Sequence, residues 1–114
     1  MSDCLFCQII AGEIPAKIAY QDDLCLAFHD IDPKAPTHVL LIPKEHIASL
    51  DRLTEDHGPL MGHLVNTAAR LARQLGVAES GYRLVANCNA DGGQVVFHIH
   101  FHLLGGRQLS WPPG

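Results

Sequence analysis

The apolar positions along the chain fall into short runs separated by turn residues, which is the pattern of strands joined by tight loops. A turn is predicted at Asp22 and Asp23, and the stretch 31–38 holds two prolines and predicts a loop. A second turn-rich loop is predicted at 89–93. The pattern therefore predicts five strands: two within 17–30, then 38–43, 82–88 and 95–104.

One segment shows helical periodicity over a full helix length. Within 54–76 the apolar residues recur at three- and four-residue spacing, and Gly76 is expected to end the helix. The predicted stripe comprises Leu60, Met61, Leu64, Val65, Ala68, Leu71, Ala72 and Leu75. A shorter helix is predicted over 4–12, with Ser2 and Asp3 as its caps.

These elements define a fold class. A doubly wound parallel sheet needs a long crossover for each strand pair, and the chain offers only one long helix. We therefore predict an α+β fold, with a five-stranded antiparallel sheet, one long helix and one short helix. The length of 114 residues suits a single domain over 1–114.

Composition narrows the partners and the location. Eight Lys plus Arg against 12 Asp plus Glu give a formal net charge of −4 without any basic run, so we expect no nucleic-acid partner. No apolar run approaches the roughly 20 residues that span a bilayer. The N-terminus lacks the basic start and apolar core of a signal peptide, so we expect a cytoplasmic protein with no membrane partner. Its four cysteines are then expected as thiols or metal ligands.

The candidate chemistry lies in the last predicted strand, where three histidines occupy alternate positions. Strand geometry would place His98, His100 and His102 on one face. The opposite, core-facing side would carry Phe97, Ile99, Phe101 and Leu103. Three histidines could be merely exposed, but strict alternation argues against chance. Three imidazoles on one strand, about 6–7 Å apart at alternate positions, are poorly placed to close on one metal ion.

The remaining interpretation is a nucleophile with helpers. Imidazole has a reference pKa of about 6.5, so much of it is neutral and nucleophilic at neutral pH. His100 is the natural nucleophile, because it alone has a histidine on each side that can assist at a phosphoryl group. The loop at 89–93 and the Gln94 amide could supply an anion cradle.

The segment HIHFHLL resembles the motif of the histidine triad (HIT) superfamily. The similarity extends to IIAGEIPAKIAYQDD, AFHDIDPKAPTHVLLIPKEHI and DGGQVVFHIHFHLLGGRQLSWPPG, and the Trp-Pro-Pro-Gly end resembles the histidine triad nucleotide-binding (HINT) branch. The resemblance implies a HIT-like fold. It identifies His100 with the nucleotidylated nucleophile, His98 and His102 with its flanking histidines, and His38 with a fourth histidine near the phosphate.

The resemblance also implies binding residues. Asp30 matches the carboxylate that holds the ribose hydroxyls, although Asp in that position could instead form a turn. The base pocket is expected from Ile14, Phe28, Ile31 and Leu40, although the last three could instead be core residues. Phosphate-side contacts are expected from Asn87, Gly93 and Gln94. Val95 stands where many relatives carry a serine near the leaving group. His29, His57 and His63 are expected at the surface or on a helix face, and Cys25 and Cys88 in the core.

Cys4 and Cys7 form a single C-x-x-C pair, which supplies at most half of a zinc site. The alternative is two thiols on the inner side of a short helix, because positions three apart share a face. The resemblance implies a zinc site formed by Cys4, Cys7, His46 and His98. HINT proteins without these cysteines work without metal, so zinc would be structural and no cofactor is required for catalysis. A His98 that binds zinc cannot also contact phosphate freely.

The resemblance further implies a homodimer with a continuous ten-stranded sheet. The tail at about 105–114 would reach toward the partner and bring Trp111 near its leaving-group site. The expected activity is hydrolysis of the P–N bond of purine nucleoside 5′-phosphoramidates through a nucleotidyl-His100 intermediate. Two alternatives remain at this stage: a dinucleoside polyphosphate hydrolase, as in the related Fhit branch, and a nucleotide-binding regulatory protein with incidental catalysis.

Overall fold

The computed structural model describes residues 3–114 as five strands, two α-helices and two short 3₁₀ helices. In chain order these are α1 (Leu5–Ile10), β1 (Ile18–Gln21), β2 (Cys25–His29), β3 (Thr37–Pro43), η1 (Leu50–Arg52), η2 (Glu55–His57), α2 (Gly58–Gln74), β4 (Tyr82–Val85) and β5 (Phe101–Gly105). Among the described residues, no helix combines the length and apolarity needed to cross a bilayer.

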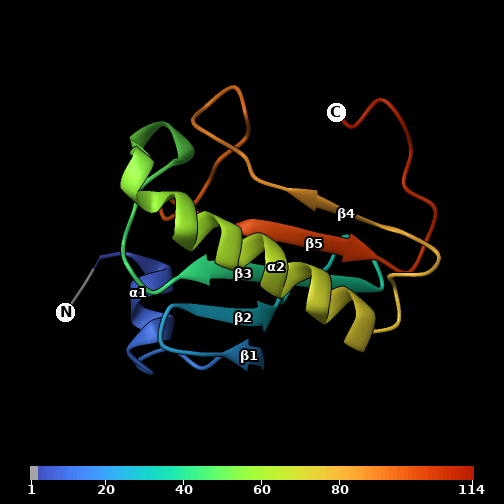
Figure 1. Ribbon diagram of the computed structural model, residues 1–114, viewed down its shortest axis with the longest axis horizontal. Helices are drawn as coiled ribbons and strands as arrows, with labels where there is room; N and C mark the ends of the chain where they lie inside the picture. The colour runs from blue at the N-terminus through green and yellow to red at the C-terminus, as the bar shows by residue number, and fades with distance from the viewer. Residues whose placement is uncertain (1–2) are drawn as a thin grey trace.

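The strands form one open sheet in the order β1-β2-β3-β5-β4, and every neighbouring pair is antiparallel. Figure 1 shows α2 lying across one face of this sheet. The α+β fold with a five-stranded antiparallel sheet, one long helix and one short helix is confirmed.

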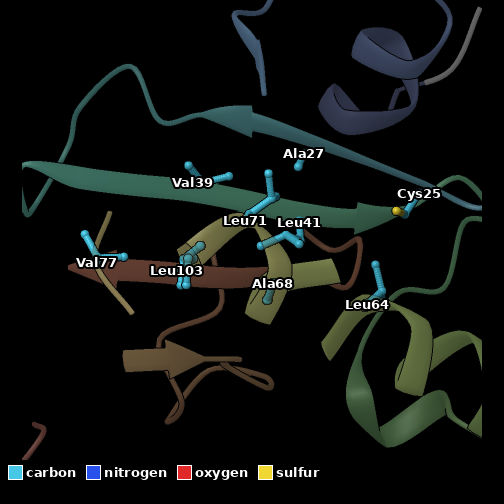
Figure 2. Close-up of a cluster of buried hydrophobic side chains, with 10 residues drawn as sticks. Cys25, Ala27, Val39, Leu41, Leu64, Ala68, Leu71, Val77 and Leu103 are labelled. Atoms are coloured by element: carbon cyan, nitrogen blue, oxygen red, sulfur yellow. The ribbon is translucent and has the colours of Figure 1, made fainter. Parts of the chain in front are cut away.

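The larger core lies between α2 and the sheet (Figure 2). Leu64, Ala68 and Leu71 from the helix pack on side chains from β2, β3 and β5. The buried members of this core are Cys25, Ala27, Val39, Leu41, Leu64, Ala68, Leu71, Ala72, Val77 and Leu103. Two residues of the predicted stripe lie at its margin, because Val65 and Leu75 are 46% and 36% exposed.

The opposite face of β2 and β3 is also buried, which explains why these strands are apolar at nearly every position. This second core consists of Phe6, Leu26, Phe28, Leu40 and Ile42. Phe6 comes from α1, so the short helix covers part of the face that α2 leaves open. Cys25 lies in the first core as predicted, whereas Cys88 is only half-buried.

The turn between β1 and β2 is fixed by Asp22. Its Oδ1 accepts the backbone N–H groups of Leu24 and Cys25, at 2.8 and 2.9 Å. Its Oδ2 accepts the Tyr20 hydroxyl at 2.8 Å and lies 2.7 Å from His63 Nε2 on α2. Burial opposes the charge of this carboxylate, but these hydrogen bonds outweigh it and hold the Asp22 pKa well below its usual range. The predicted turn thus also ties the hairpin to α2.

Three local predictions were wrong. The N-cap of α1 is Cys4, whose Sγ accepts the Cys7 N–H at 3.4 Å, and not Asp3; Ser2 lies outside the described residues. The regular strand β5 begins only at Phe101, so residues 95–100 are irregular. Phe97 is consequently 50% exposed instead of facing the core.

Candidate functional site

The site begins with a row of side chains that strand register places side by side. Phe28 on β2 pairs with Leu40 on β3, and Leu40 pairs with His102 on β5. Directly paired residues in antiparallel strands point to the same face. His38 lies two residues before Leu40 on that face, diagonal to His102. The sheet face opposite α2 thus carries two apolar side chains followed by two imidazoles.

A cavity of about 360 Å³ opens over this row. Ten residues that the sequence predicted for the site line it: Ile14, Phe28, Asp30, Ile31, Leu40, Asn87, Gly93, Val95, His100 and His102. Apart from His29, Asp30, Asn87 and the two imidazoles, the lining is apolar. The cavity therefore combines an apolar chamber with a small polar end, as ligand sites commonly do.

His100 is held in a defined tautomer. Its Nδ1 lies 2.7 Å from the backbone carbonyl oxygen of His98, and a carbonyl can only accept, so Nδ1 carries the proton and donates. The lone pair is then on Nε2. His100 is 8% exposed and lines the cavity, so its Nε2 can act there as a nucleophile.

A second hydrogen-bond chain orients His102. The Lys34 N–H donates to His38 Nδ1 at 3.0 Å, so His38 carries its proton on Nε2. His38 Nε2 lies 2.9 Å from His102 Nδ1 and donates to it, which leaves His102 with Nε2–H as a donor. Asp30 Oδ2 lies 3.4 Å from His38 Nε2 and supports this arrangement. His38 therefore orients the His102 ring through this hydrogen bond and does not itself line the cavity.

Burial lowers the pKa values of three histidines in this region, His38, His98 and His102. Burial, with the neighbouring His100 and His38 imidazoles, lowers the pKa of His102 to about 4. Burial is also the main cause that lowers the pKa values of His38 and His98. At neutral pH the hydrogen bond between His38 and His102 therefore joins two uncharged rings.

The two cysteines meet two histidines at the start of α1, outside the lining of the cavity. Ligand atoms of Cys4, Cys7, His46 and His98 all lie within 4.8 Å of one another. The Cys4 and Cys7 sulfurs lie 3.4 and 3.6 Å from His98 Nδ1, and the two histidine Nδ1 atoms are 3.2 Å apart. Cys7 Sγ lies 3.4 Å from His46 Nδ1.

These separations fit a tetrahedral zinc ion. Zinc bonds of about 2.3 Å to sulfur and 2.0–2.1 Å to nitrogen place ligand sulfur and nitrogen about 3.5 Å apart, and two nitrogens about 3.3 Å apart. His98 Nε2 donates to the Pro43 carbonyl at 2.8 Å, which leaves Nδ1 as the free ligand atom. The four residues could hold zinc without rearrangement of the chain.

His98 therefore does not join the phosphate side of the site. The sequence predicted three histidines on one face, but His98 precedes the regular part of β5, is fully buried and points to the cysteines. Its contribution to the cavity is its backbone carbonyl, which fixes His100. Only His100 and His102 of the triad line the cavity.

Gln94 also has a different place from the one predicted. Its Oε1 accepts the Asn89 N–H, and its Nε2 donates to the carbonyls of Ala48 and Val96. The backbone N–H groups of Gly93 and Gln94 donate to Ala90 and Asn89 within the same loop. Gly93 adopts a φ of +81°, a conformation that suits glycine. Gln94 thus holds the loop together and is not available as an anion cradle.

Three predicted contacts lie at or beyond the mouth of the cavity. Ile31 and Val95 belong to its lining but are 100% and 86% exposed. Trp111 is 80% exposed, lies 6.0 Å from the Arg83 guanidinium and does not line the cavity.

Part of the lining was not predicted. His29, expected at the surface, is half-buried in the wall. The other unpredicted residues are Leu5, Phe6, Ile9, Pro15, Ala16 and Val96. Phe6 and Ile9 are three residues apart on a short predicted helix. This spacing could have indicated an apolar helix face that packs against another element.

The comparison with known families agrees with this arrangement. Residues 11–109 match the model of the HIT domain. The chain belongs to the HIT family. An uncharacterized HIT-like protein of Synechococcus elongatus is 55% identical over 112 residues, which cover 98% of this chain and 97% of the relative. The purine nucleoside phosphoramidase of Escherichia coli is 50% identical over 108 residues, covering 95% and 91%.

Solved structures support the same assignment for this HIT protein. A HIT family hydrolase from Legionella pneumophila has a TM-score of 0.97 and 54% identity, and the match covers 98% of this chain and all of that one. A histidine triad nucleotide-binding protein from Candida albicans has a TM-score of 0.82 and 34% identity, covering 96% and 83%. The fold and the resemblance to the HINT branch are thereby confirmed, and the chain is a HIT family hydrolase by relationship.

The neutral state of His102 can be measured. NMR titration of the folded protein is expected to give His102 a pKa of about 4, against about 6.5 for histidine in the urea-denatured chain as control. Because the folded pKa is the lower one, the unfolded chain binds more protons between these values. His102 should therefore lower folding stability as pH falls from about 6.5 toward 4. A folded midpoint near 6.5 would contradict the burial assigned to it.

Proposed function

We propose that this protein hydrolyses the P–N bond of purine nucleoside 5′-phosphoramidates through a nucleotidyl-His100 intermediate. The observation that carries the proposal is the hydrogen bond from His100 Nδ1 to the His98 carbonyl, which leaves Nε2 as a nucleophile at the cavity. The named activity of the Escherichia coli relative supports this choice of substrate.

The first step follows from the tautomers. His100 Nε2 attacks phosphorus, a new N–P bond forms, and the bond to the amine breaks. The resulting nucleotidyl imidazole is positively charged, and its Nδ1–H still donates to the His98 carbonyl, which stabilises that charge. The amine leaves with the bond electrons and takes one proton from solvent. His102, with a donor at Nε2, is placed to hydrogen-bond a phosphoryl oxygen.

Water completes the cycle. It attacks phosphorus, the Nε2–P bond breaks, and the electron pair returns to His100 as the nucleotide is released. One proton of the water stays on the released phosphate, and the other returns to solvent in place of the proton that the amine took. The Nδ1–H tautomer of His100 is regenerated, so no cofactor enters the balance.

The cavity offers a place for each part of the nucleotide. Its apolar end, with Ile14, Phe28 and Leu40, suits the purine base. Asp30 lies on the same wall, where its carboxylate can accept the ribose hydroxyls. Its Oδ1 already accepts the Asp32 N–H at 2.8 Å, which fixes the carboxylate in position.

The protein also binds one zinc ion, in this proposal, through Cys4, Cys7, His46 and His98. The tetrahedral spacing of the four ligand atoms and the Nε2 hydrogen bond of His98 support it. When bound, the ion supplies a structural cross-link and takes no part in the chemistry. A reducing, cytoplasmic location suits this use of thiols.

A homodimer completes the proposal. Within residues 3–114, strand β4 is at an edge of the sheet and pairs with β5 alone, and exposed sheet edges are usually covered. Tyr82 on β4 and Val65 on α2 are 38% and 46% exposed, which gives apolar surface for a two-fold contact. Joining two β4 edges would produce a continuous ten-stranded sheet.

Replacing His100 tests the reaction. His100→Ala should lose turnover of an adenylated amine while AMP binding stays nearly unchanged, since the ring contributes the attacking atom. Intact-mass spectrometry of wild type during a single turnover should detect a nucleotidyl adduct, and the His100→Ala protein provides the blank. Sustained turnover by His100→Ala would rule out the mechanism. Tight AMP binding without turnover by wild type would favour the regulatory alternative.

Metal analysis tests the zinc site. Protein expressed with zinc present should contain about one ion per chain, and chelation should lower its melting temperature, because binding free energy adds to folding. A Cys4→Ser, Cys7→Ser protein is the control and should contain little zinc. Zinc content near zero in wild type would leave the cysteines as plain thiols.

Light scattering tests the assembly. At micromolar concentration we expect twice the chain mass of 12.4 kDa, and a monomer mass would refute the dimer.

Deleting residues 110–114 should alter the preference among leaving amines more than the melting temperature, because Trp111 is exposed and outside the core. A Trp111→Ala protein separates the effect of the ring from that of the remaining tail.

A further inference from the structure

Helix α1 depends on the rest of the protein for its position. It has only six residues, too few for a stable isolated helix. It nevertheless supplies Leu5, Phe6 and Ile9 to the wall of the nucleotide cavity. Two of the four cluster residues, Cys4 and Cys7, lie at its start, as its N-cap and in its first turn.

Phe6 lies between the two cysteines in sequence and joins the cluster to the catalytic ring in space. It is 4% exposed, and its ring meets the rings of His98 and His100 edge-on, with centroids 5.9 and 5.0 Å apart. It also meets Phe28 edge-on at 5.6 Å, on the strand that forms the apolar end of the cavity. Displacement of α1 would therefore remove the Phe6 ring that packs against His100.

His98 provides a second path between the same two places. Its ring is in the cluster, and its carbonyl accepts the His100 Nδ1–H at 2.7 Å. The next residue, Ile99, donates its N–H to the Ile47 carbonyl at 2.8 Å, adjacent to His46. The segment that carries His98 and the segment that carries His46 are thus joined by backbone as well as by the cluster.

We propose that the cluster of Cys4, Cys7, His46 and His98 is a latch for the active site. Zinc held there would fix α1 as a wall of the nucleotide cavity and fix the His98 carbonyl that sets the His100 tautomer. The inference rests on the proposed zinc site and nucleotide function. It extends them, because metal occupancy then controls nucleotide affinity and His100 orientation as well as stability.

The expected change in AMP affinity depends on the fraction of molecules in which α1 is docked. Apparent affinity falls in proportion to the fraction of molecules in the binding-competent state, so a wall that is docked a tenth of the time raises the AMP Kd about ten-fold. The large core under α2 contains no cluster residue and should keep its structure.

The experiment compares zinc-loaded, chelated and reloaded protein without using turnover. On chelation, hydrogen exchange should speed up at the α1 amides of Gln8 and Ala11, which donate to Cys4 and Cys7 carbonyls. Amides of α2 serve as the internal reference. The AMP Kd should rise about ten-fold. Nitrogen-15 NMR should show His100 changing from a single Nδ1–H tautomer to a mixture, and reloading should reverse all three changes.

Substitution of one proposed zinc ligand distinguishes loss of zinc from non-specific effects of the chelator. His46 is exposed and does not line the nucleotide cavity, so His46→Gln should weaken zinc binding without touching the nucleotide. As zinc is titrated into this variant, AMP affinity should follow zinc occupancy. His57→Gln is the matched control, since glutamine at that position can still accept the Thr54 N–H. Its AMP affinity should equal that of wild type at every zinc concentration.

The outcomes separate the latch from the reaction. Unchanged AMP Kd, α1 exchange and His100 tautomer on zinc removal would overturn the latch, even if turnover proceeds through His100. Failure to bind zinc at all would overturn it too. Loss of the proposed reaction would appear instead as turnover that persists in His100→Ala, a measurement in which zinc plays no part.

Discussion

The pairing of β3 with β5 is the constraint on which the site depends. The register that opposes Leu40 to His102 places the histidine beside the apolar row of β2 and β3, on the face away from α2. A slip of one residue would turn His102 into the core under α2 and Leu103 out of it. Leu103 is fully buried against that core, so burial on one face fixes the position of the imidazole on the other.

The same alternation explains what could be predicted from the sequence. Residues such as Phe28, Leu40 and His102 lie within regular strands, where period two determines the face, and their places in the site followed from pattern and resemblance. The break before Phe101 could not be predicted in this way. Because residues 95–100 do not form a regular strand, His98 points toward the cysteines while His100 lines the cavity. The two-residue period of a strand would have placed both side chains on the same face.

Tertiary contacts account for the other differences. The Gln94 amide could be expected to bind an anion, but its oxygen and nitrogen already form three hydrogen bonds with backbone groups of the protein. Phe6 was not expected in the site, because its role depends on how α1 docks across the sheet. In both cases the residue type was compatible with either place, and only the packing of distant segments decides between them.

The electrostatics of the cavity bear on its substrate. Among the described residues that line it there is no Lys or Arg, whereas Asp30 contributes a carboxylate and His102 is neutral at pH 7. Each additional phosphate would bring further negative charge toward Asp30 with no basic group of the lining to offset it. A neutral N–H donor can bind one phosphoryl group, and His102 retains such a donor at Nε2. This balance supports the proposed substrate, a mononucleotide joined to an amine, over a dinucleoside polyphosphate, and the acidic net charge of −4 acts in the same direction.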